Sequence, residues 1–382
     1  MPNGTYGGVR GRKITVVKKI LRYFPPTRLH VAAICCNFEV SFQKIDMSKK
    51  ILVTGAGGFI GGYIVKEALK RGYETWAAVR KTTSREYLTD ERIHFLELDF
   101  SDADALKKQL GDAISENGRW DYIIHNLGAT KAVNFLAFNT VNYDYLKLFV
   151  DTLISLEAQP QAFLMMSSLS AVGGGDEDTY EPIPSRPIPH PETKYGVSKL
   201  KAETYLQCQS TVPYIIFRTT GVYGPHEKDY YLMFKSIKKG FDFSVGFKRQ
   251  LLTFIYVEDL TRAMLDALES GNTNKVYNIS EDKAYTQKEF RDMAKKALGK
   301  KFVLPVVCPL FIVKMVCAIS DYWGTITMKP STLNRDKYNI LKVRNWSCDV
   351  SEAKKDFGFK IEYPLERGIE EAVKWYKQEG WL

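Results

Sequence analysis

Apolar and polar positions along the chain alternate between the period of a strand and the period of a helix. A short apolar run at 51–53 leads into four glycines among the seven positions 55–61, and a periodic apolar segment at 63–71 follows. This pattern predicts a buried strand, a tight turn and a helix that ends at Gly72. Later apolar runs predict further strands at 73–79, 93–98, 122–126 and 162–166. Because strands and helices alternate, we expect an α/β fold with a doubly wound parallel sheet.

The glycine cluster predicts a binding site for a dinucleotide. Gly55 allows a sharp turn, Gly58 lets the backbone approach a pyrophosphate, and Gly61 lets the helix pack closely on the strand. Phe59 and Ile60 begin the helix, whose N-terminus faces the anion. The alternative is a glycine-rich turn with a structural role alone. The flanking strand and helix favour a Rossmann arrangement, in which this turn carries the cofactor.

The end of the second predicted strand indicates which dinucleotide binds. About 20 residues after the glycines, an acidic residue would hold the ribose 2′-hydroxyl of NAD. This chain has Arg80 there, followed by Lys81 and Arg85, with no carboxylate before Glu86. A basic loop suits a 2′-phosphate, so we expect NADP(H), with NAD(H) as the alternative cofactor. A solvated basic loop is the other interpretation.

Two further strand ends supply candidate cofactor contacts. Asp99 follows the third strand and is placed to accept a hydrogen bond from the adenine amino group, and Phe100 to pack on the adenine ring. Leu127 and Gly128 follow the fourth strand, where a bend of small residues can lie against the cofactor. We therefore count these four residues among those that bind the cofactor.

Candidate catalytic groups lie farther along the chain. The strand at 162–166 opens into a serine-rich stretch, and Tyr195 follows Ser168 by 27 residues. Tyr195 and Lys199 are four residues apart, so they share one helical face, although an exposed helix face is the alternative interpretation. A phenol titrates near pH 10 and a neighbouring ammonium favours the phenolate, so the pair can move a proton at neutral pH. A nearby serine hydroxyl would bind the same substrate oxygen.

These motifs resemble the extended short-chain dehydrogenase/reductase family of the NAD-dependent epimerase/dehydratase type, over residues 50–280. The resemblance implies that the three glycines bind the pyrophosphate and that Asp99 and Phe100 hold the adenine. It also implies that Tyr195 is the general acid or base and that Lys199 holds the nicotinamide ribose as well.

The resemblance also assigns residues around the nicotinamide. Ser168 matches the catalytic serine because it lies five residues before Gly173, with Ser167 and Ser170 as alternatives. Thr220 belongs to a stretch similar to the strand and loop beside the nicotinamide, so it is counted with the cofactor-binding residues.

The substrate class is indicated by a departure from the family pattern. Members that act on nucleotide sugars usually carry an arginine where residues 250–254 read Gln-Leu-Leu-Thr-Phe, and Lys248 and Arg249 are the nearby substitutes. The apolar run 302–319 is interrupted too often to span a bilayer. We expect either a core helix or the wall of an apolar pocket that also contacts the membrane interface. The C-terminal stretch 349–382 resembles steroid- and lipid-type 3-hydroxy dehydrogenases of the family.

Length and charge indicate the organisation of the chain. Its 382 residues exceed the size of a single core, so a larger and a smaller domain are expected. Residues 1–46 carry eight Lys and Arg against two acids, and we expect a basic extension that is disordered or not part of the native protein. The Rossmann domain is expected at 47–225, with 250–280 returning to it. Residues 226–382 should form mainly a smaller α/β substrate domain.

Composition also indicates which binding partners and which cell compartment to expect. The extension has no block of like charge, so no nucleic-acid partner is expected. Six cysteines without paired spacing indicate reduced thiols, no metal and a cytoplasmic protein, or one peripheral at the inner face of the membrane. By the family resemblance we expect a homodimer through the helix at 132–156 and the helix that carries Tyr195.

Together these features predict an NADP(H)-dependent oxidoreductase that interconverts a ketone and a secondary alcohol on an apolar, lipid- or steroid-like molecule. The first alternative is a nucleotide-sugar epimerase or dehydratase that retains a tightly bound NAD. The second is a noncatalytic dinucleotide-binding scaffold, which the intact Tyr195 and Lys199 disfavour.

Overall fold

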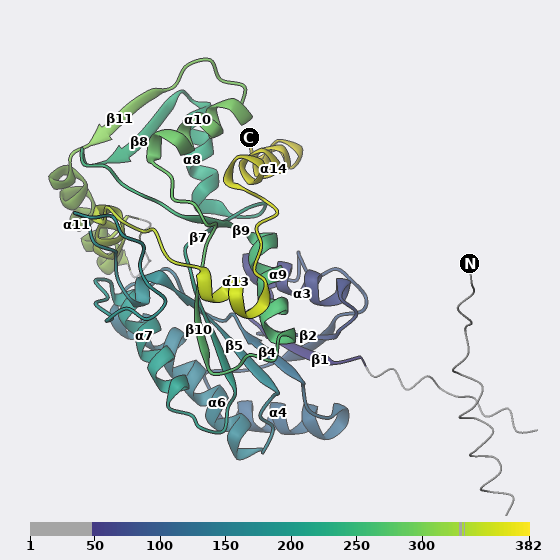
Figure 1. The fold of residues 1–382 in the computed structure, drawn as a ribbon. Coiled ribbons are helices and arrows are strands. Elements are labelled where there is room, and N and C mark those ends of the chain that lie inside the picture. Colours follow the sequence, from purple (N-terminus) through teal and green to yellow (C-terminus); the bar gives the residue numbers. More distant parts are fainter. Residues whose placement is uncertain (1–47, 328–330, 332) are drawn as a thin grey trace, which may run out of the picture. The chain divides into compact units, whose positions relative to one another are not determined.

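The structure, a computed structural model, describes residues 48–327, 331 and 333–382 (Figure 1). The expected basic extension at 1–46, with Cys35 and Cys36, lies outside the described residues. Residues 48–382 form one compact unit. Strands and helices alternate through its first half, as the apolar pattern predicts.

Seven strands of the described chain form one parallel sheet, in the order β10-β6-β5-β4-β1-β2-β3. They are β1 (Lys50–Thr54), β2 (Glu74–Val79), β3 (His94–Glu97), β4 (Tyr122–His125), β5 (Ala162–Ser168), β6 (Tyr214–Thr219) and β10 (Lys275–Ile279). The strand order reverses between β1 and β4, which is where a ligand crevice forms in such sheets. The predicted doubly wound α/β sheet is confirmed, and the first five strands end within two residues of the predicted positions.

Helices cover both faces of this sheet, so each face has its own hydrophobic core. On one face lie α3 (Phe59–Lys70), α9 (Val257–Glu269) and α13 (Ser351–Phe357), and on the other α4 (Ala103–Asn117), α6 (Tyr145–Ser155) and α7 (Lys194–Gln207). Ile64 and Leu260 are buried on the first face, and Phe149 and Leu206 on the second. Burial on both faces explains why the strands read as continuous apolar runs.

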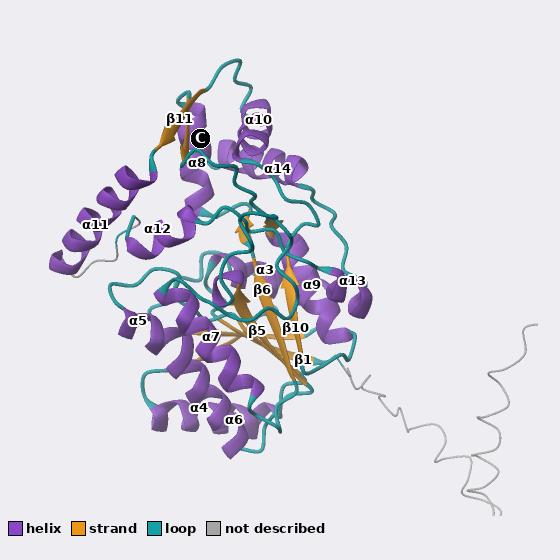
Figure 2. Cartoon of the chain, turned by 60° about the vertical axis from the view of Figure 1, so that its left-hand side comes forward, coloured by secondary structure: helices purple, strands orange, loops and turns teal. Residues whose placement is uncertain are grey.

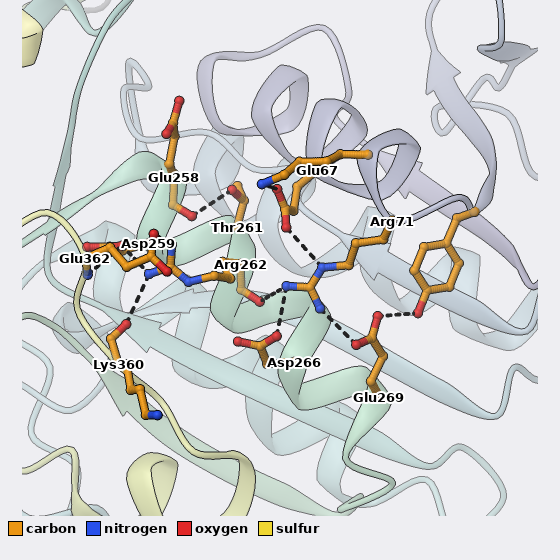
Figure 3. Close-up of polar contacts among 12 residues, drawn as sticks. Glu67, Arg71, Glu258, Asp259, Thr261, Arg262, Asp266, Glu269, Lys360 and Glu362 are labelled. Carbon is orange, nitrogen blue, oxygen red and sulfur yellow. Dashed lines mark hydrogen bonds and ion pairs between the residues drawn. The ribbon is translucent and has the colours of Figure 1, made fainter.

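Ion pairs connect α3 and α9, two helices of the first face (Figure 3). Arg71, the residue after α3, contacts Asp266 at 2.8 Å and Glu269 at 2.9 Å, both on α9, and its own-helix neighbour Glu67 at 3.0 Å. At the other end of α9, the buried Asp259 pairs with Arg262 and accepts the backbone N–H groups of residues 362 and 363. These contacts hold α3, and with it the glycine turn, against the body of the protein.

A third hydrophobic core lies in the second half of the chain. The same part of the chain contains two small parallel sheets. One pairs β7 (Gly221–Tyr223) with β9 (Phe254–Tyr256), and the other pairs β8 (Phe241–Val245) with β11 (Leu304–Cys308). The helices are α8 (Lys228–Lys238), α10 (Gln287–Ala297) and α14 (Leu365–Gln378). Phe234, Phe290 and Tyr376 are fully buried among them.

The apolar run at 302–319 divides at Pro309 into β11 and the start of α11 (Leu310–Thr327), which packs beside α12 (Arg335–Lys342). The interpretation as a core helix is wrong, because most large apolar side chains of α11 are exposed. In the described part of the chain, no helix is both long and apolar enough to cross a membrane.

Candidate active site

The glycine turn has the geometry of a pyrophosphate site. Gly55 follows β1 with φ +66°, a conformation that L side chains rarely adopt. A Cβ at Gly61 would lie 2.1 Å from the Gly55 carbonyl oxygen, so helix and turn are in direct contact. Gly58 caps α3, and no described side chain bonds to the cap of this helix. Phe59 and Ile60 therefore begin a first turn whose N–H groups suit an anion.

The basic loop after β2 borders this turn. Arg80 is exposed, and its backbone N–H donates to the Thr83 hydroxyl at 3.0 Å. The Thr83 methyl group reaches the glycine turn, since a Cβ at Gly57 would lie 2.2 Å from it. Arg85 instead lies over the Phe95 ring and pairs with Glu97 at 3.3 Å. Arg80 is therefore the arginine of this loop that lies beside the glycine turn.

Asp99 and Phe100, the second and third residues after β3, are oriented differently from each other. Asp99 is exposed, and it accepts hydrogen bonds from the backbone and hydroxyl of Ser101. Phe100 is 6% exposed, and its ring packs on Phe149 with centroids 5.6 Å apart. The ring of Phe100 is thus a core side chain and not an exposed adenine platform, because the chain turns it under the sheet edge.

The bend after β4 is held by an asparagine that sequence reasoning missed. Asn142 donates to the carbonyl of Ala129 at 3.0 Å and accepts from its N–H at 2.8 Å. Its amide also donates to the Ser198 hydroxyl at 2.9 Å, which links the bend to α7. Asn142 lies in a π-helical turn (Thr140–Asp144), a local widening common at functional sites. The available signal was the two asparagines, Asn139 and Asn142, within an otherwise mostly apolar segment.

The end of β5 and the start of α7 bring three residues together: Ser168, Tyr195 and Lys199. Ser168 ends β5, and its hydroxyl bonds with that of Tyr195 and also accepts the Ser170 N–H at 3.2 Å. The amino group of Lys199 donates to the Met166 carbonyl at 2.9 Å, and a Cβ at Gly128 would lie 2.9 Å from it. The structure therefore brings together the three predicted catalytic residues and the bend at Leu127 and Gly128.

Burial determines the protonation of this group. It raises the pKa of Tyr195 to about 12, and the hydrogen bond from Ser168 lowers that pKa only in part. Burial also lowers the pKa of Lys199 to about 8, against the opposing effect of the Glu203 carboxylate. In this arrangement burial therefore favours the protonated phenol of Tyr195, and the amino group of Lys199 bonds to the Met166 carbonyl.

The alternative serine, Ser167, has a different partner. Its hydroxyl donates to Glu203, which also accepts from the Arg218 guanidinium at 3.0 Å and 2.7 Å. Glu203 and Arg218 are 0% and 6% exposed, so this is a buried ion pair directly below the catalytic group. Ser167 therefore belongs to a structural network, which favours Ser168 at the reaction centre.

Two buried polar atoms near this centre have no hydrogen-bond partner among the described residues. They are the hydroxyl of Thr220, which follows β6, and Nε2 of His125, which ends β4. His125 Nδ1 bonds with the Thr54 hydroxyl at 3.1 Å, so only one of its ring nitrogens is satisfied. Because buried polar groups are normally paired, the Thr220 hydroxyl supports a polar ligand in the crevice, whereas the His125 ring is stacked with Phe149 and Phe163 in the core. No group of three or more His, Cys, Asp and Glu in the described chain could hold a metal.

Helix α12 lies over the start of α7. Asp336 accepts the backbone N–H of Tyr195 at 3.2 Å, and Asn339 donates to the carbonyl of Glu192 at 2.9 Å. Lys342 also pairs with the Glu192 carboxylate at 2.6 Å. A segment from the C-terminal part of the chain therefore contacts the backbone beside Tyr195, and α11 packs against this segment.

A comparison with known protein families identifies the family of this chain. Residues 51–280 match the NAD dependent epimerase/dehydratase family. The chain belongs to this family. It is therefore an NAD(P)-dependent enzyme of the extended short-chain dehydrogenase/reductase type.

Individual relatives within the family are distant. The chain is 22% identical to dTDP-D-glucose 4,6-dehydratase of Bos taurus, over 87% of this chain and 90% of the relative. It is 24% identical to ceramide reductase of Caulobacter vibrioides, over 88% and 97% of the two chains. The solved UDP-glucose 4-epimerase of Thermotoga maritima, determined with UDP-glucose, aligns with a TM-score of 0.68 and 22% identity, covering 86% and 99%. The Bordetella bronchiseptica enzyme WbmG was solved with NAD and UDP, and aligns with a TM-score of 0.68, 20% identity and coverage of 87% and 96%.

Residues 250–254 form the stretch where sugar-nucleotide enzymes of the family usually carry an arginine. In this chain the stretch forms hydrogen bonds with backbone carbonyls of residues 343 and 344. Leu251 donates its N–H to the Arg344 carbonyl at 2.7 Å, and Gln250 donates to the carbonyl of Val343. The guanidinium of Arg344 is buried against backbone carbonyls, including Val245 at 2.7 Å. The nearby Arg249 lies 5.5 Å from the centre of the Tyr180 ring. Among the described residues, neither guanidinium forms an ion pair with a carboxylate.

Proposed function

We propose that this enzyme uses NADP(H) to interconvert a ketone and a secondary alcohol on an apolar, lipid- or steroid-like substrate. The feature that carries the reaction is the Tyr195 hydroxyl, which is bonded to Ser168 at the carboxyl end of the sheet. Burial raises the pKa of this phenol to about 12, so it carries its proton at neutral pH. The hydroxyl can therefore give a proton to a ketone oxygen or, as the tyrosinate, take one from an alcohol.

The chain's own residues divide the work of this reaction. The bound dinucleotide supplies a hydride to the carbonyl carbon. Tyr195 gives its hydroxyl proton to the carbonyl oxygen, and the Ser168 hydroxyl holds the same oxygen by a hydrogen bond. Lys199, beside Gly128, would hold the nicotinamide ribose and stabilise the tyrosinate that forms. The unpartnered Thr220 hydroxyl would contact the nicotinamide side of the cofactor.

The preference for NADP(H) rests on Arg80. Its side chain is exposed at the end of β2, where an acidic residue would select NAD. Asp99 is exposed at the neighbouring strand end and is available to the adenine amino group. Solved relatives were determined with NAD, so NAD(H) is the alternative cofactor.

The apolar substrate is supported by the composition of the stretch at 250–254 and by the name of one relative. Leu251 and Leu252 stand where a charge would hold a diphosphate. The 24% identical ceramide reductase is a relative with a lipid substrate in its name.

A nucleotide-sugar epimerase or dehydratase is the second candidate, and the names of several relatives favour it. In that reaction the hydride returns to the substrate, so the cofactor is not consumed. A noncatalytic scaffold would turn over neither substrate.

The deciding experiment follows cofactor consumption by the purified full chain. With NADPH, we expect a loss of absorbance at 340 nm with a long-chain or polycyclic ketone and none with UDP- or dTDP-glucose. Conversion of a nucleotide sugar without net cofactor consumption, and no activity on apolar ketones, would overturn the lipid assignment. Tyr195→Phe is the control that separates enzymatic from background reduction.

We also propose a homodimer through α7 and the helical segment within 132–156, which begins with α5 (Phe135–Asn139). Leu136 is 69% exposed, and Phe135 and Val197 are exposed beside it on these contacting helices. The other aromatic residues of the segment contribute less than the sequence suggested, because Phe138 and Phe149 are buried within the subunit.

A further inference from the structure

Helix α11 carries its apolar side chains on the outside. Phe311, Met315, Ile319 and Trp323 recur every four residues and are 71%, 55%, 53% and 59% exposed. Residues at this spacing form one stripe on a helix. Cys317 of α11 is buried, and it lies on the side of the helix opposite to this stripe. An ordinary surface helix has the opposite arrangement, with its apolar stripe turned inwards.

The two-stranded sheet next to α11 continues this surface. Phe241 and Phe243 are exposed on one face of β8, with ring centroids 6.3 Å apart, and Leu304 of β11 is in register with Phe241. Asp242 between them points to the other face, where it accepts from Gln287 at 2.9 Å. The outer face of this sheet is therefore apolar.

The sheet and the helix form one continuous surface. β11 leads through Pro309 directly into α11, as Figure 2 shows. The turn after β8 touches the start of the helix, since a Cβ at Gly246 would lie 3.4 Å from the Leu310 side chain. We call the outer faces of 241–247 and 302–326 the apolar surface. Apolar areas of this kind, formed by many adjacent exposed residues, mark sites of interaction.

The charges around the apolar surface are of one sign. Within 241–249 and 300–327, the exposed charged residues are all basic: Lys248, Arg249, Lys300, Lys301 and Lys314. The two acids of these segments are not exposed, since Asp242 is 3% accessible and Asp321 is half-buried with Arg335 at 3.5 Å. An apolar surface with aromatic residues and a basic rim is complementary to the interface of an anionic lipid bilayer.

We propose that the apolar surface docks the enzyme on an anionic lipid bilayer as a peripheral protein. Phe311, Met315 and Trp323 would enter the region between headgroups and acyl chains, while Lys300, Lys301 and their neighbours contact phosphates. A second copy of the chain is a poorer occupant, because a two-fold contact through this surface would bring two basic rims together. This inference does not depend on which substrate the enzyme converts.

The test is sedimentation of the full chain with vesicles of phosphatidylcholine alone or containing 30% phosphatidylserine. Lys300→Glu/Lys301→Glu should weaken binding to the anionic vesicles on the order of 25-fold or more, because each basic residue near such a surface contributes about five-fold. Phe311→Glu should also abolish most of the binding. Two matched controls, Lys107→Glu/Lys108→Glu on α4 and Ile188→Glu, introduce the same changes at exposed positions elsewhere and should bind as the wild type does.

Residues 1–46 are basic too, and they are identical in all five proteins. Equal binding of every variant would assign the affinity to another part of the chain and overturn the proposal. Absence of binding to anionic vesicles would overturn it as well. A different set of results would show that a second copy covers the surface. In that case the wild type is dimeric by light scattering and does not bind vesicles, and the Phe311→Glu variant is monomeric. Circular dichroism establishes that each variant is folded.

Discussion

Replacing Glu203 by glutamine should destabilise the protein strongly, although the side chain keeps its size. Glu203 has no exposed area, and it accepts three hydrogen bonds from Arg218 at 2.7, 3.0 and 3.2 Å, as well as one from Ser167. Glu203→Gln leaves the guanidinium of Arg218, itself 6% exposed, without this counter-charge. Removing one partner of a buried pair costs about 3–5 kcal/mol of unfolding free energy.

The same change should alter the pH dependence of turnover. Lys199 lies one helical turn before Glu203, and the carboxylate opposes the burial that lowers the pKa of Lys199 to about 8. Without the carboxylate this pKa falls further, so the ammonium form is lost at lower pH. If the ammonium supports the reaction, the alkaline decline of kcat/KM should move to lower pH in Glu203→Gln.

Urea unfolding at pH 7, followed by circular dichroism, measures the loss of stability. Glu269→Gln is the matched control, because Glu269 pairs with Arg71 at 2.9 Å but its side chain is 42% exposed, and such pairs contribute about 0–1 kcal/mol. The double variant Glu203→Gln/Arg218→Met should recover much of the loss, since no unpaired buried charge remains. A cost for Glu203→Gln no larger than that of the control, or a double variant as unstable as the sum of its single changes, would refute the reasoning.

Four further outcomes are expected. Arg80→Ala should weaken NADPH binding by about 1.5–3 kcal/mol and leave NADH unchanged in a titration of both cofactors, whereas equal effects would contradict the NADP(H) assignment. Tyr195→Phe should abolish turnover and preserve cofactor affinity, and wild-type turnover would exclude Tyr195 as the acid. Burial lowers the pKa of His125 to about 3, so the unfolded chain binds a proton near pH 6.5 before the folded one does. Stability therefore falls as pH drops below 6.5, and between pH 7 and 5 the wild type should lose about 2 kcal/mol that His125→Leu retains in urea titrations. Leu136→Asp should convert a dimer to a monomer in light scattering, and a wild type that is monomeric at micromolar concentration would remove the dimer.

The sequence alone determined the parts of this protein that depend on short-range pattern. The apolar run at β1, the glycines at 55, 58 and 61 and the helix after them can be recognised because a strand, a turn and a helix each have a local periodicity and composition. Alternation of such units permits few topologies, so the parallel sheet could be predicted as well. Tyr195 and Lys199 were found for the same reason, since four residues along a helix always share a face.

Only the tertiary structure decided how side chains from distant segments face one another. The sequence could not show that Phe100 turns into the core, that Asn142 holds the bend at Gly128, or that Ser167 is engaged by Glu203, 36 residues away. Each of these depends on which face of an element meets which neighbour, and no local period records that. The same holds for the run at 302–319. Its apolar residues predict burial, but whether a helix buries them in its own fold or presents them outwards depends on the surrounding packing, and here α11 presents them to the exterior.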